Sequence, residues 1–313
     1  MSPKLRPMST GEVLDRTFNL YRNHFLLFTG ISVGQVMCMM VGVLLVYLLA
    51  GALAQGIDSP DPAFVGLAIV VYMMVVGLFY LIGYALGTGA TIYAVSKLHL
   101  GYAAGIVESY REMRPMVWRT MRIVITVFVR LMGIMMLTEL VIGTLAVIVI
   151  RAKPDFRGSS LDVAFNIFLF TVFVAGSAWA ARVTCQYSLA VPACVLERLP
   201  ARQALKRSSW LTARALGRIF LAFLLMGILS LGLFYALQIP GFLVAESHPG
   251  FVAFGLRWAG IFISMILAFP IGTIALSLIY YDQRVRKEAF DLQVLMDALA
   301  GQPQVQPASA PLV

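Results

Sequence analysis

The chain has 313 residues, of which 60% are hydrophobic and only 12% carry a formal charge. A water-soluble globular chain carries about a quarter charged residues. That shortfall, together with a mean hydropathy of +0.86, excludes soluble enzymes, disordered chains and collagen-like sequences. The three cysteines, Cys38, Cys185 and Cys194, lie in or beside apolar runs, which excludes a disulfide framework. The composition indicates an integral membrane protein.

Six apolar stretches are long enough to cross a bilayer, whose hydrocarbon core needs about 20 mainly apolar residues per helix. They cover roughly residues 25–54, 64–96, 118–150, 163–194, 216–245 and 251–281. None shows the polar and apolar alternation of membrane strands. Pro270 with Gly272 predicts a kink in the sixth stretch, and Pro192 predicts another near the end of the fourth. We therefore predict an all-α polytopic membrane protein with six transmembrane helices.

The basic residues predict the orientation of these helices. Most of the 24 Lys and Arg lie in the N-terminal segment, in the connections between stretches two and three and between four and five, and after the sixth stretch. The opposite loops hold Arg151, Lys153, Arg157 and Arg257. Cytoplasmic loops carry the excess of Lys and Arg, so we expect both termini and both long connections in the cytoplasm.

The net charge of +9 follows from this topology and suits a surface that faces anionic lipid headgroups. The sequence contains no helix-turn-helix or RNA-binding signature, so no nucleic-acid partner is expected. The first apolar stretch follows an amphipathic segment and lacks a small-residue cleavage site. We therefore expect no cleaved signal peptide.

Three amphipathic segments, residues 14–25, 107–118 and 205–216, each precede an odd-numbered stretch. They align without gaps at offsets of 93 and 98 residues, and each has an apolar residue at its first, seventh and last position. This self-similarity predicts three tandem units, each an interfacial helix followed by a helical hairpin. The units cover about residues 1–102, 103–199 and 200–300 of a single membrane domain, 1–300. The Gln- and Pro-rich tail 301–313 is expected to be disordered.

The charged elbow segments allow two interpretations. In the first segment Val13, Leu14 and Phe18 share one face, and Ser9 with Glu12 matches a capping box, so the helix can lie in the headgroup layer. The three helices can serve as elbows that orient the next span, or they can form a docking surface for a partner or for lipid headgroups. The candidate docking residues are Arg16, Arg22, Arg111, Arg114, Lys206, Arg207, Arg284, Arg286 and Lys287. The residues after Tyr280 are expected to continue the last span as a solvated helix.

Three motifs carry a family resemblance. They are Arg6-Pro7-x-Ser9-x-Gly11-Glu12-x-Leu14-Asp15, then Pro192-x-x-x-Leu196-Glu197 followed by Ala204-Leu205-x-Arg207-Ser208, and Tyr280-Tyr281-Asp282-x-Arg284-Val285-Arg286-Lys287-Glu288-x-Phe290-Asp291-Leu292. Over nearly the whole chain up to about residue 295, the sequence resembles bacterial multi-span proteins of the glycerophosphoryl diester phosphodiesterase membrane-domain type. In the enzymes of that family, hydrolysis belongs to a separate soluble barrel domain. The resemblance therefore implies a membrane module without the phosphodiesterase activity.

The sequence shows no catalytic constellation. Its histidines, His24, His99 and His248, form no zinc-binding pattern. The pentapeptide Gly30–Gly34 has the letters of a Gly-x-Ser-x-Gly elbow but lies inside an apolar stretch, where small residues allow close helix approach. Gly83-x-x-x-Gly87 is interpreted in the same way. We therefore expect a protein that is not an enzyme and holds no cofactor or metal.

Arg130 and Glu139 lie inside the third stretch, where a charge costs about 2.5–3.5 kcal/mol on the insertion scale. Nine residues at about 100° each place them on opposite helix faces, so they do not pair with each other. Candidate neighbours are Thr138, and Tyr47 or Gln238 from other spans. Arg130 can extend toward the cytoplasmic surface while Glu139 is hydrogen-bonded in the bundle. Alternatively, the two residues line a polar substrate or ion path, or contact a partner subunit.

Two functional hypotheses follow from these patterns. The first is a non-enzymatic accessory or scaffold protein of the inner membrane that binds a larger membrane protein complex or lipid headgroups. The second is a small transporter or lipid-handling protein that uses Arg130 and Glu139. An intramembrane enzyme ranks behind both.

Overall fold

The computed structural model of the protein describes residues 8–54, 62–152, 160–247 and 250–288. Within these ranges the chain forms helices and no strand. Six helical segments are long and apolar enough to cross a membrane, which confirms the predicted all-α polytopic fold. They are Phe25–Leu49, Val65–His99, Ile106–Val149, Asp162–Leu196, Leu216–Val244 and Phe254–Glu288. The predicted tail 301–313 lies outside the described residues.

The element order places short helices before each pair of long ones. The first group is α1 (Thr10–Asn23), α2 (Phe25–Ala54) and α3 (Pro62–His99). The second is α4 (Ile106–Met113) with the 3-10 turn η1 (Arg114–Met116), then α5 (Val117–Ala152) and α6 (Ser160–Tyr187). The third is α7 (Ala190–Leu196), α8 (Ala201–Thr212), α9 (Leu216–Ser247) and α10 (Phe251–Glu288).

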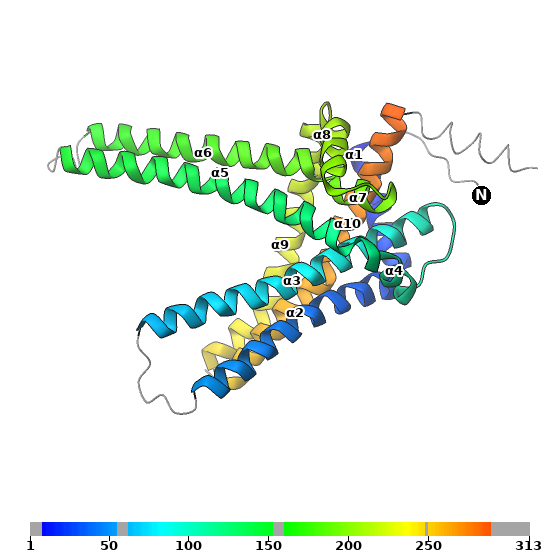
Figure 1. The fold of residues 1–313 in the computed structure, drawn as a ribbon, viewed down its shortest axis with the longest axis horizontal. Coiled ribbons are helices and arrows are strands. Elements are labelled where there is room, and N and C mark those ends of the chain that lie inside the picture. The colour runs from blue at the N-terminus through cyan, green and yellow to red at the C-terminus, as the bar shows by residue number, and fades with distance from the viewer. Residues whose placement is uncertain (1–7, 55–61, 153–159, 248–249, 289–313) are drawn as a thin grey trace, which may run out of the picture.

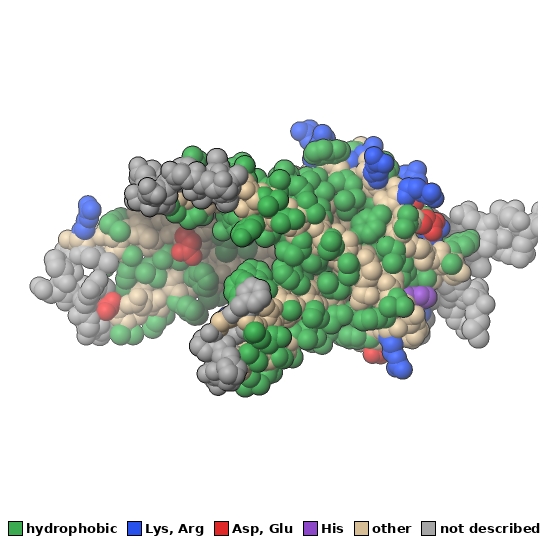
Figure 2. Space-filling view, turned by 90° about the horizontal axis from the view of Figure 1, so that it is seen from below, with side chains coloured by type: hydrophobic (Ala, Val, Ile, Leu, Met, Phe, Trp, Pro, Cys, Tyr) green, Lys and Arg blue, Asp and Glu red, His purple; other side chains and the backbone are tan. Residues whose placement is uncertain are grey.

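The long helices form three hairpins, α2–α3, α5–α6 and α9–α10, which are joined at one end and diverge toward the other (Figure 1). The short helices lie at the joined end. Figure 2 shows that most Lys and Arg side chains of the visible face gather there as well, so we call it the cationic end. Arg151 and Arg257 mark the opposite end, near the tips of α5–α6 and α9–α10.

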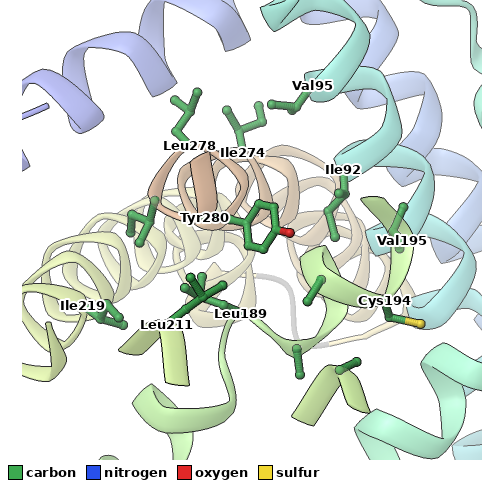
Figure 3. Close-up of a cluster of buried hydrophobic side chains, with 14 of the residues drawn as sticks. Ile92, Val95, Leu189, Cys194, Val195, Leu211, Ile219, Ile274, Leu278 and Tyr280 are labelled. Carbon is green, nitrogen blue, oxygen red and sulfur yellow. The ribbon is translucent and has the colours of Figure 1, made fainter. Parts of the chain in front are cut away.

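The hydrophobic core lies at the cationic end, where all three groups of helices meet. Its fully buried side chains include Ile92, Leu189, Leu211, Ile274 and Tyr280 (Figure 3). Farther along the hairpins, large apolar side chains such as Met73, Met74 and Met136 are exposed. Water would not tolerate this much apolar surface, whereas lipid tails solvate it at no cost. The exposed halves of the hairpins are therefore the parts that require a bilayer.

The fourth apolar stretch differs from the expected single helix. Helix α6 ends at Tyr187, and after a turn at Ser188 and Leu189 the chain continues as the short helix α7. Pro192 therefore lies near the start of a separate helix, where a missing N–H is tolerated, and it does not kink α6. Pro270 does lie inside a continuous helix, α10. It has no N–H to donate to Ile266, and close by the Tyr21 hydroxyl donates to the Leu267 carbonyl at 3.1 Å.

Helix α1 begins with the predicted capping box. The Ser9 hydroxyl accepts from the Glu12 N–H at 3.2 Å, and the Glu12 carboxylate accepts from the Ser9 N–H at 2.7 Å. The protein covers only part of the apolar face of α1. Val13 and Thr17 are buried where α1 packs along α10, whereas Phe18 is 41% exposed. Burial raises the pKa of Tyr21, which keeps its hydroxyl a hydrogen-bond donor.

Glycines on α3 set how closely it approaches α2, as the small-residue pattern predicted. A Cβ on Gly83 would lie 2.8 Å from the Gln35 carbonyl oxygen, and a Cβ on Gly87 would lie 2.5 Å from Gln35 Oε1. At Gly83 the obstacle is backbone, so the helices themselves would have to move apart.

Gly83→Ala is expected to lower the free energy of unfolding by about 1–3 kcal/mol, because the added methyl overpacks a backbone contact. Gly77→Ala is the matched control on the same helix, since a Cβ there meets nothing within 4 Å. It should leave stability unchanged or raise it by about 0.5–1 kcal/mol. Thermal unfolding in detergent micelles measures both, and equal stability of the two variants would contradict the close contact.

Candidate functional site

An ionic network around Glu197 ties α7, α8 and α10 together at the cationic end. The Arg207 guanidinium donates to both Glu197 oxygens at 3.0–3.1 Å and pairs with Glu288. Tyr280 donates its hydroxyl to Glu197, and Arg284 pairs with Glu288 at 3.0 Å. Burial of Arg207 opposes its charge, but the two carboxylates outweigh burial and raise the pKa of the guanidinium. The network therefore holds fixed, complementary charges.

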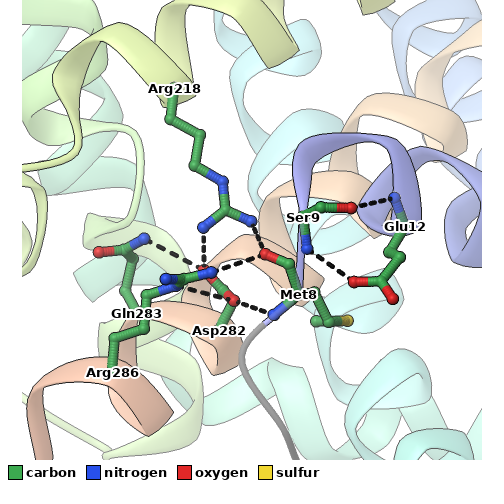
Figure 4. A network of polar contacts seen from close by, with 7 residues as sticks. All are labelled: Met8, Ser9, Glu12, Arg218, Asp282, Gln283 and Arg286. Atoms are coloured by element: carbon green, nitrogen blue, oxygen red, sulfur yellow. Dashed lines mark hydrogen bonds and ion pairs between the residues drawn. The ribbon is translucent and has the colours of Figure 1, made fainter.

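A second network surrounds Asp282, which is 1% exposed. Its carboxylate accepts from the Met8 backbone N–H at 2.7 Å, from Arg218 at 2.7 Å and from Arg286 at 3.0 Å (Figure 4). Both guanidiniums also donate to the Met8 carbonyl. The side-chain amide of Gln283 also donates to the Asp282 carboxylate, at 3.3 Å. One buried carboxylate thus joins the segment before α1 to the start of α9 and the end of α10.

The structure divides the nine candidate docking residues into two groups. Arg207, Arg284, Arg286 and Lys287 bond to other parts of the chain, Lys287 through the Trp210 carbonyl. The other five are exposed on α1, α4, η1 and α8, and none forms an ion pair within the described ranges. These exposed cations are Arg16, Arg22, Arg111, Arg114 and Lys206.

A cavity of about 400 Å³ lies between the first and third hairpins, with walls from α2, α3, α9 and α10. Apolar side chains such as Met39, Phe223 and Phe269 form most of the wall. Polar groups are interspersed among them, and they are Ser32, Gln35, Tyr80, Tyr84, Ser230 and Thr273. We call this space the hairpin cavity. Sequence reasoning did not find it, because isolated hydroxyl and amide residues in apolar stretches carry no periodic signal.

Gln35 is the least satisfied of the polar groups in the hairpin cavity. Its side chain is buried, and its Oε1 has no hydrogen-bond partner in the part of the chain that the structure describes. By contrast, the hydroxyls of Ser32 and Thr273 donate to carbonyls of their own helices at 3.1 and 3.3 Å. A buried polar atom without a partner costs about 1–3 kcal/mol. Oε1 lies beside Gly87, where an added Cβ would be 2.5 Å away, so the cost arises where α2 and α3 approach closely.

A second cavity, of about 280 Å³, opens between the middle hairpin and the other two. Tyr84, Phe223 and Leu276 line both cavities, so they form the partition between them. Arg130 reaches the edge of the second cavity, since its guanidinium lies 4.8 Å from the ring centroid of Tyr187, a lining residue. A cation over an aromatic face is one way to hold a charge at membrane depth.

Glu139 is placed differently from Arg130. Its side chain is exposed on α5, and no described residue pairs with it or hydrogen-bonds to it. Its neighbour Thr138 is buried against α6, where a Cβ on Gly176 would lie 2.3 Å from Thr138 Oγ1. Tyr47 is 75% exposed, and Gln238 is buried in α9. The structure therefore brings neither Arg130 nor Glu139 to the hairpin cavity.

The described residues do not assemble a metal site, and the serine of the Gly-x-Ser-x-Gly pentapeptide lies within a helix. They contain no group of three His, Cys, Asp or Glu side chains that could hold a metal ion. The pentapeptide Gly30–Gly34 lies within α2, where a Cβ on Gly30 would clash with Ile106 and one on Gly34 with Tyr110. Both glycines therefore make room for α4, as expected for packing residues.

Asp282→Asn is expected to lower the free energy of unfolding by about 3–5 kcal/mol, because it leaves two guanidiniums without their shared counter-charge. The control is Glu112→Gln, which removes a carboxylate from an exposed pair with Arg198 at 4.0 Å. That change should cost less than about 1 kcal/mol. Thermal unfolding in detergent compares them, and similar values would show that the Asp282 network does not join the helices.

The three motifs behind the family resemblance meet at the cationic end. Ser9 and Glu12 cap α1, Glu197 and Arg207 form the first network, and Asp282 and Arg286 the second. Comparison with protein-family models, curated proteins and solved structures gives no match for this chain. The family assignment therefore stays a prediction that rests on these motifs.

Proposed function

We propose that the protein is a non-enzymatic lipid-handling protein of the bacterial inner membrane, which binds an amphiphilic lipid in the hairpin cavity. The hairpin cavity carries this proposal, because its wall is mostly apolar and has a few interspersed polar groups, Gln35 among them. Small-molecule sites are typically about 300–1,000 Å³, mostly apolar, and contain a few polar groups that fix orientation. The hairpin cavity has all three properties.

The position of the hairpin cavity selects the ligand class. Its walls come from four membrane-spanning helices, so a ligand reaches it through lipid. A molecule in the bilayer interior is mainly hydrocarbon, which suits Met39, Phe223 and Phe269. A hydroxyl or amide on that molecule can both donate to and accept from the polar groups of the wall, among them Gln35 and Tyr80. We therefore propose an uncharged polar group, such as a hydroxyl or an ester-linked glycerol, at Gln35.

Gly272→Leu tests this function by filling the hairpin cavity. Gly272 lines the cavity, and a Cβ there meets nothing within 4 Å, so the leucine can enter without displacing protein. Leucine also has a better helix propensity than glycine, so stability should not fall. We expect native mass spectrometry of gently solubilised protein to show a bound lipid in the wild type and loss of about nine-tenths of it in Gly272→Leu.

Gly227→Leu is the control for that experiment. Gly227 lies on α9, is exposed, and likewise has open space at its Cβ, but it does not line the hairpin cavity. It should retain the wild-type lipid. Equal lipid occupancy in the two leucine variants would overturn the proposed function.

The exposed cations favour a second candidate, the accessory or scaffold protein. Arg16, Arg22, Arg111, Arg114 and Lys206 project from the short helices at the cationic end without an ion pair in the described ranges. With the cationic end in the cytoplasm, they would face anionic headgroups or an acidic surface of a larger membrane complex.

Replacing these five residues together with Gln is expected to release a stoichiometric partner that copurifies with the wild type in mild detergent. Native mass spectrometry reads the complex directly. Arg151→Gln, at the opposite end, should keep it. A wild-type protein that purifies without a partner, or a partner retained by the fivefold variant, would contradict the accessory function.

A further inference from the structure

A pocket of about 520 Å³ lies where α9 begins and α10 ends. Four cationic side chains line it, Arg214, Arg218, Arg286 and Lys287, together with Gln283, Ala215 and Gly217. We call it the phosphate pocket for the ligand inferred below. It is separate from the hairpin cavity, with which it shares no lining residue.

The charges around the phosphate pocket do not balance. Asp282 is the acid that bonds to this set, and it is shared by Arg218 and Arg286. Glu288, the next acid along α10, pairs instead with Arg207 and Arg284. The Lys287 ammonium donates to a carbonyl, and Arg214 has no ion-pair partner among the described residues. Among the residues that the structure describes, the four cations therefore exceed the one carboxylate by three charges.

The backbone at the start of α9 adds to this positive field. Ala215 accepts the first helical hydrogen bond, from the Ile219 N–H at 3.0 Å, and an alanine side chain cannot cap the N–H groups that follow. Gly217 has open space where a Cβ would be, so an anion can approach its backbone closely. The uncapped end of a long helix favours negative charge.

We infer that the phosphate pocket binds a phosphate group. Guanidiniums and helix N-termini recognise phosphate through charge-assisted hydrogen bonds, and three uncompensated charges match a phosphate or pyrophosphate better than a single carboxylate. The group can belong to a lipid headgroup or to a soluble phosphate. Arg214 and Lys287 are the residues proposed to contact it, because Arg218 and Arg286 also hold Asp282 and the Met8 carbonyl. The Lys287 ammonium donates to the Trp210 carbonyl and has two further donors for a ligand.

The test compares the wild type with Arg214→Gln/Lys287→Gln, which leaves the Asp282 network intact. The control is Arg122→Gln/Arg202→Gln, which removes the same charge from exposed positions on α5 and α8 that do not line the pocket. Calorimetric titration of the detergent-solubilised protein with inorganic phosphate and pyrophosphate, at ionic strength matched with chloride, covers the soluble source. Native mass spectrometry with added phosphatidic acid, against phosphatidylcholine, covers the lipid source.

We expect the pocket variant to weaken binding of a phosphate compound at least tenfold, since two charge-assisted contacts are lost, while the control binds as the wild type does. If the pocket variant binds inorganic phosphate or pyrophosphate more weakly than the wild type does, the ligand is a soluble phosphate. If only its binding of phosphatidic acid is weaker, the ligand is a lipid headgroup. The unliganded pocket variant should be at least as stable as the wild type, because it removes like-charge repulsion.

Binding of all three probes that is undetectable, or equal in the pocket variant and the control, would overturn the inference. Gly272→Leu should leave phosphate binding unchanged, because it alters only the hairpin cavity. The outcome at the phosphate pocket is therefore independent of the outcome for the lipid-handling function.

Discussion

The arrangement of the helices depends on two carboxylates, the buried Asp282 and the partly buried Glu197. Transmembrane helices gain little from the hydrophobic effect, since lipid tails are as apolar as their side chains. Polar contacts that lipid cannot replace therefore decide which helix ends stay together. Asp282 joins the segment before α1 to α9 and α10. Glu197, at the end of α7, joins that helix to α8 and α10. Removing Asp282 would leave Arg218 and Arg286 without their shared carboxylate. Removing Glu197 would take the acceptor from Tyr280 and leave Arg207 with Glu288 alone.

Joining the hairpins at one end leaves their other ends free to diverge. Exposed side chains such as Met73 and Met136 show that the outer halves are not covered by protein, and the hairpins separate there (Figure 1). The hairpin cavity and the second cavity lie between the fixed end and the diverging ends, separated by Tyr84, Phe223 and Leu276. A space of this kind can exchange molecules with the bilayer without a conformational change of the core.

The sequence was sufficient to predict the six spans, the capping box at Ser9 and Glu12, and the packing function of Gly83 and Gly87. These features have local signals, namely apolar length, a four-residue cap pattern and small-residue spacing. The break between α6 and α7 was missed because Ser188 and Leu189 do not interrupt the apolar run. Hydropathy measures how favourably each residue transfers from water to lipid. The break between α6 and α7 depends instead on the packing of α7 against the other helices, which hydropathy does not describe.

The candidate site was harder to predict, because its residues are brought together by long-range contacts. Arg207, Arg284 and Arg286 have the same sequence character as Arg16 and Arg22, and only tertiary structure shows that the first three pair with acids. From the sequence, Gln35 does not differ from other polar residues in apolar helices. The structure shows that its Oε1 lies beside Gly87 and has no hydrogen-bond partner in the described ranges.

The positive-inside rule predicts which side of the membrane the cations occupy, and it leaves their local arrangement open. Exposed cations on a membrane surface lie apart because they repel one another. Salt screens the repulsion once the charges are farther apart than about a Debye length. Arg16, Arg22 and Lys206 follow this behaviour on different faces and helices. Arg214, Arg218, Arg286 and Lys287 do not, since they line one pocket with a single carboxylate between them. Topology requires the charges of these four residues but not their convergence, and an anion is what makes that convergence favourable.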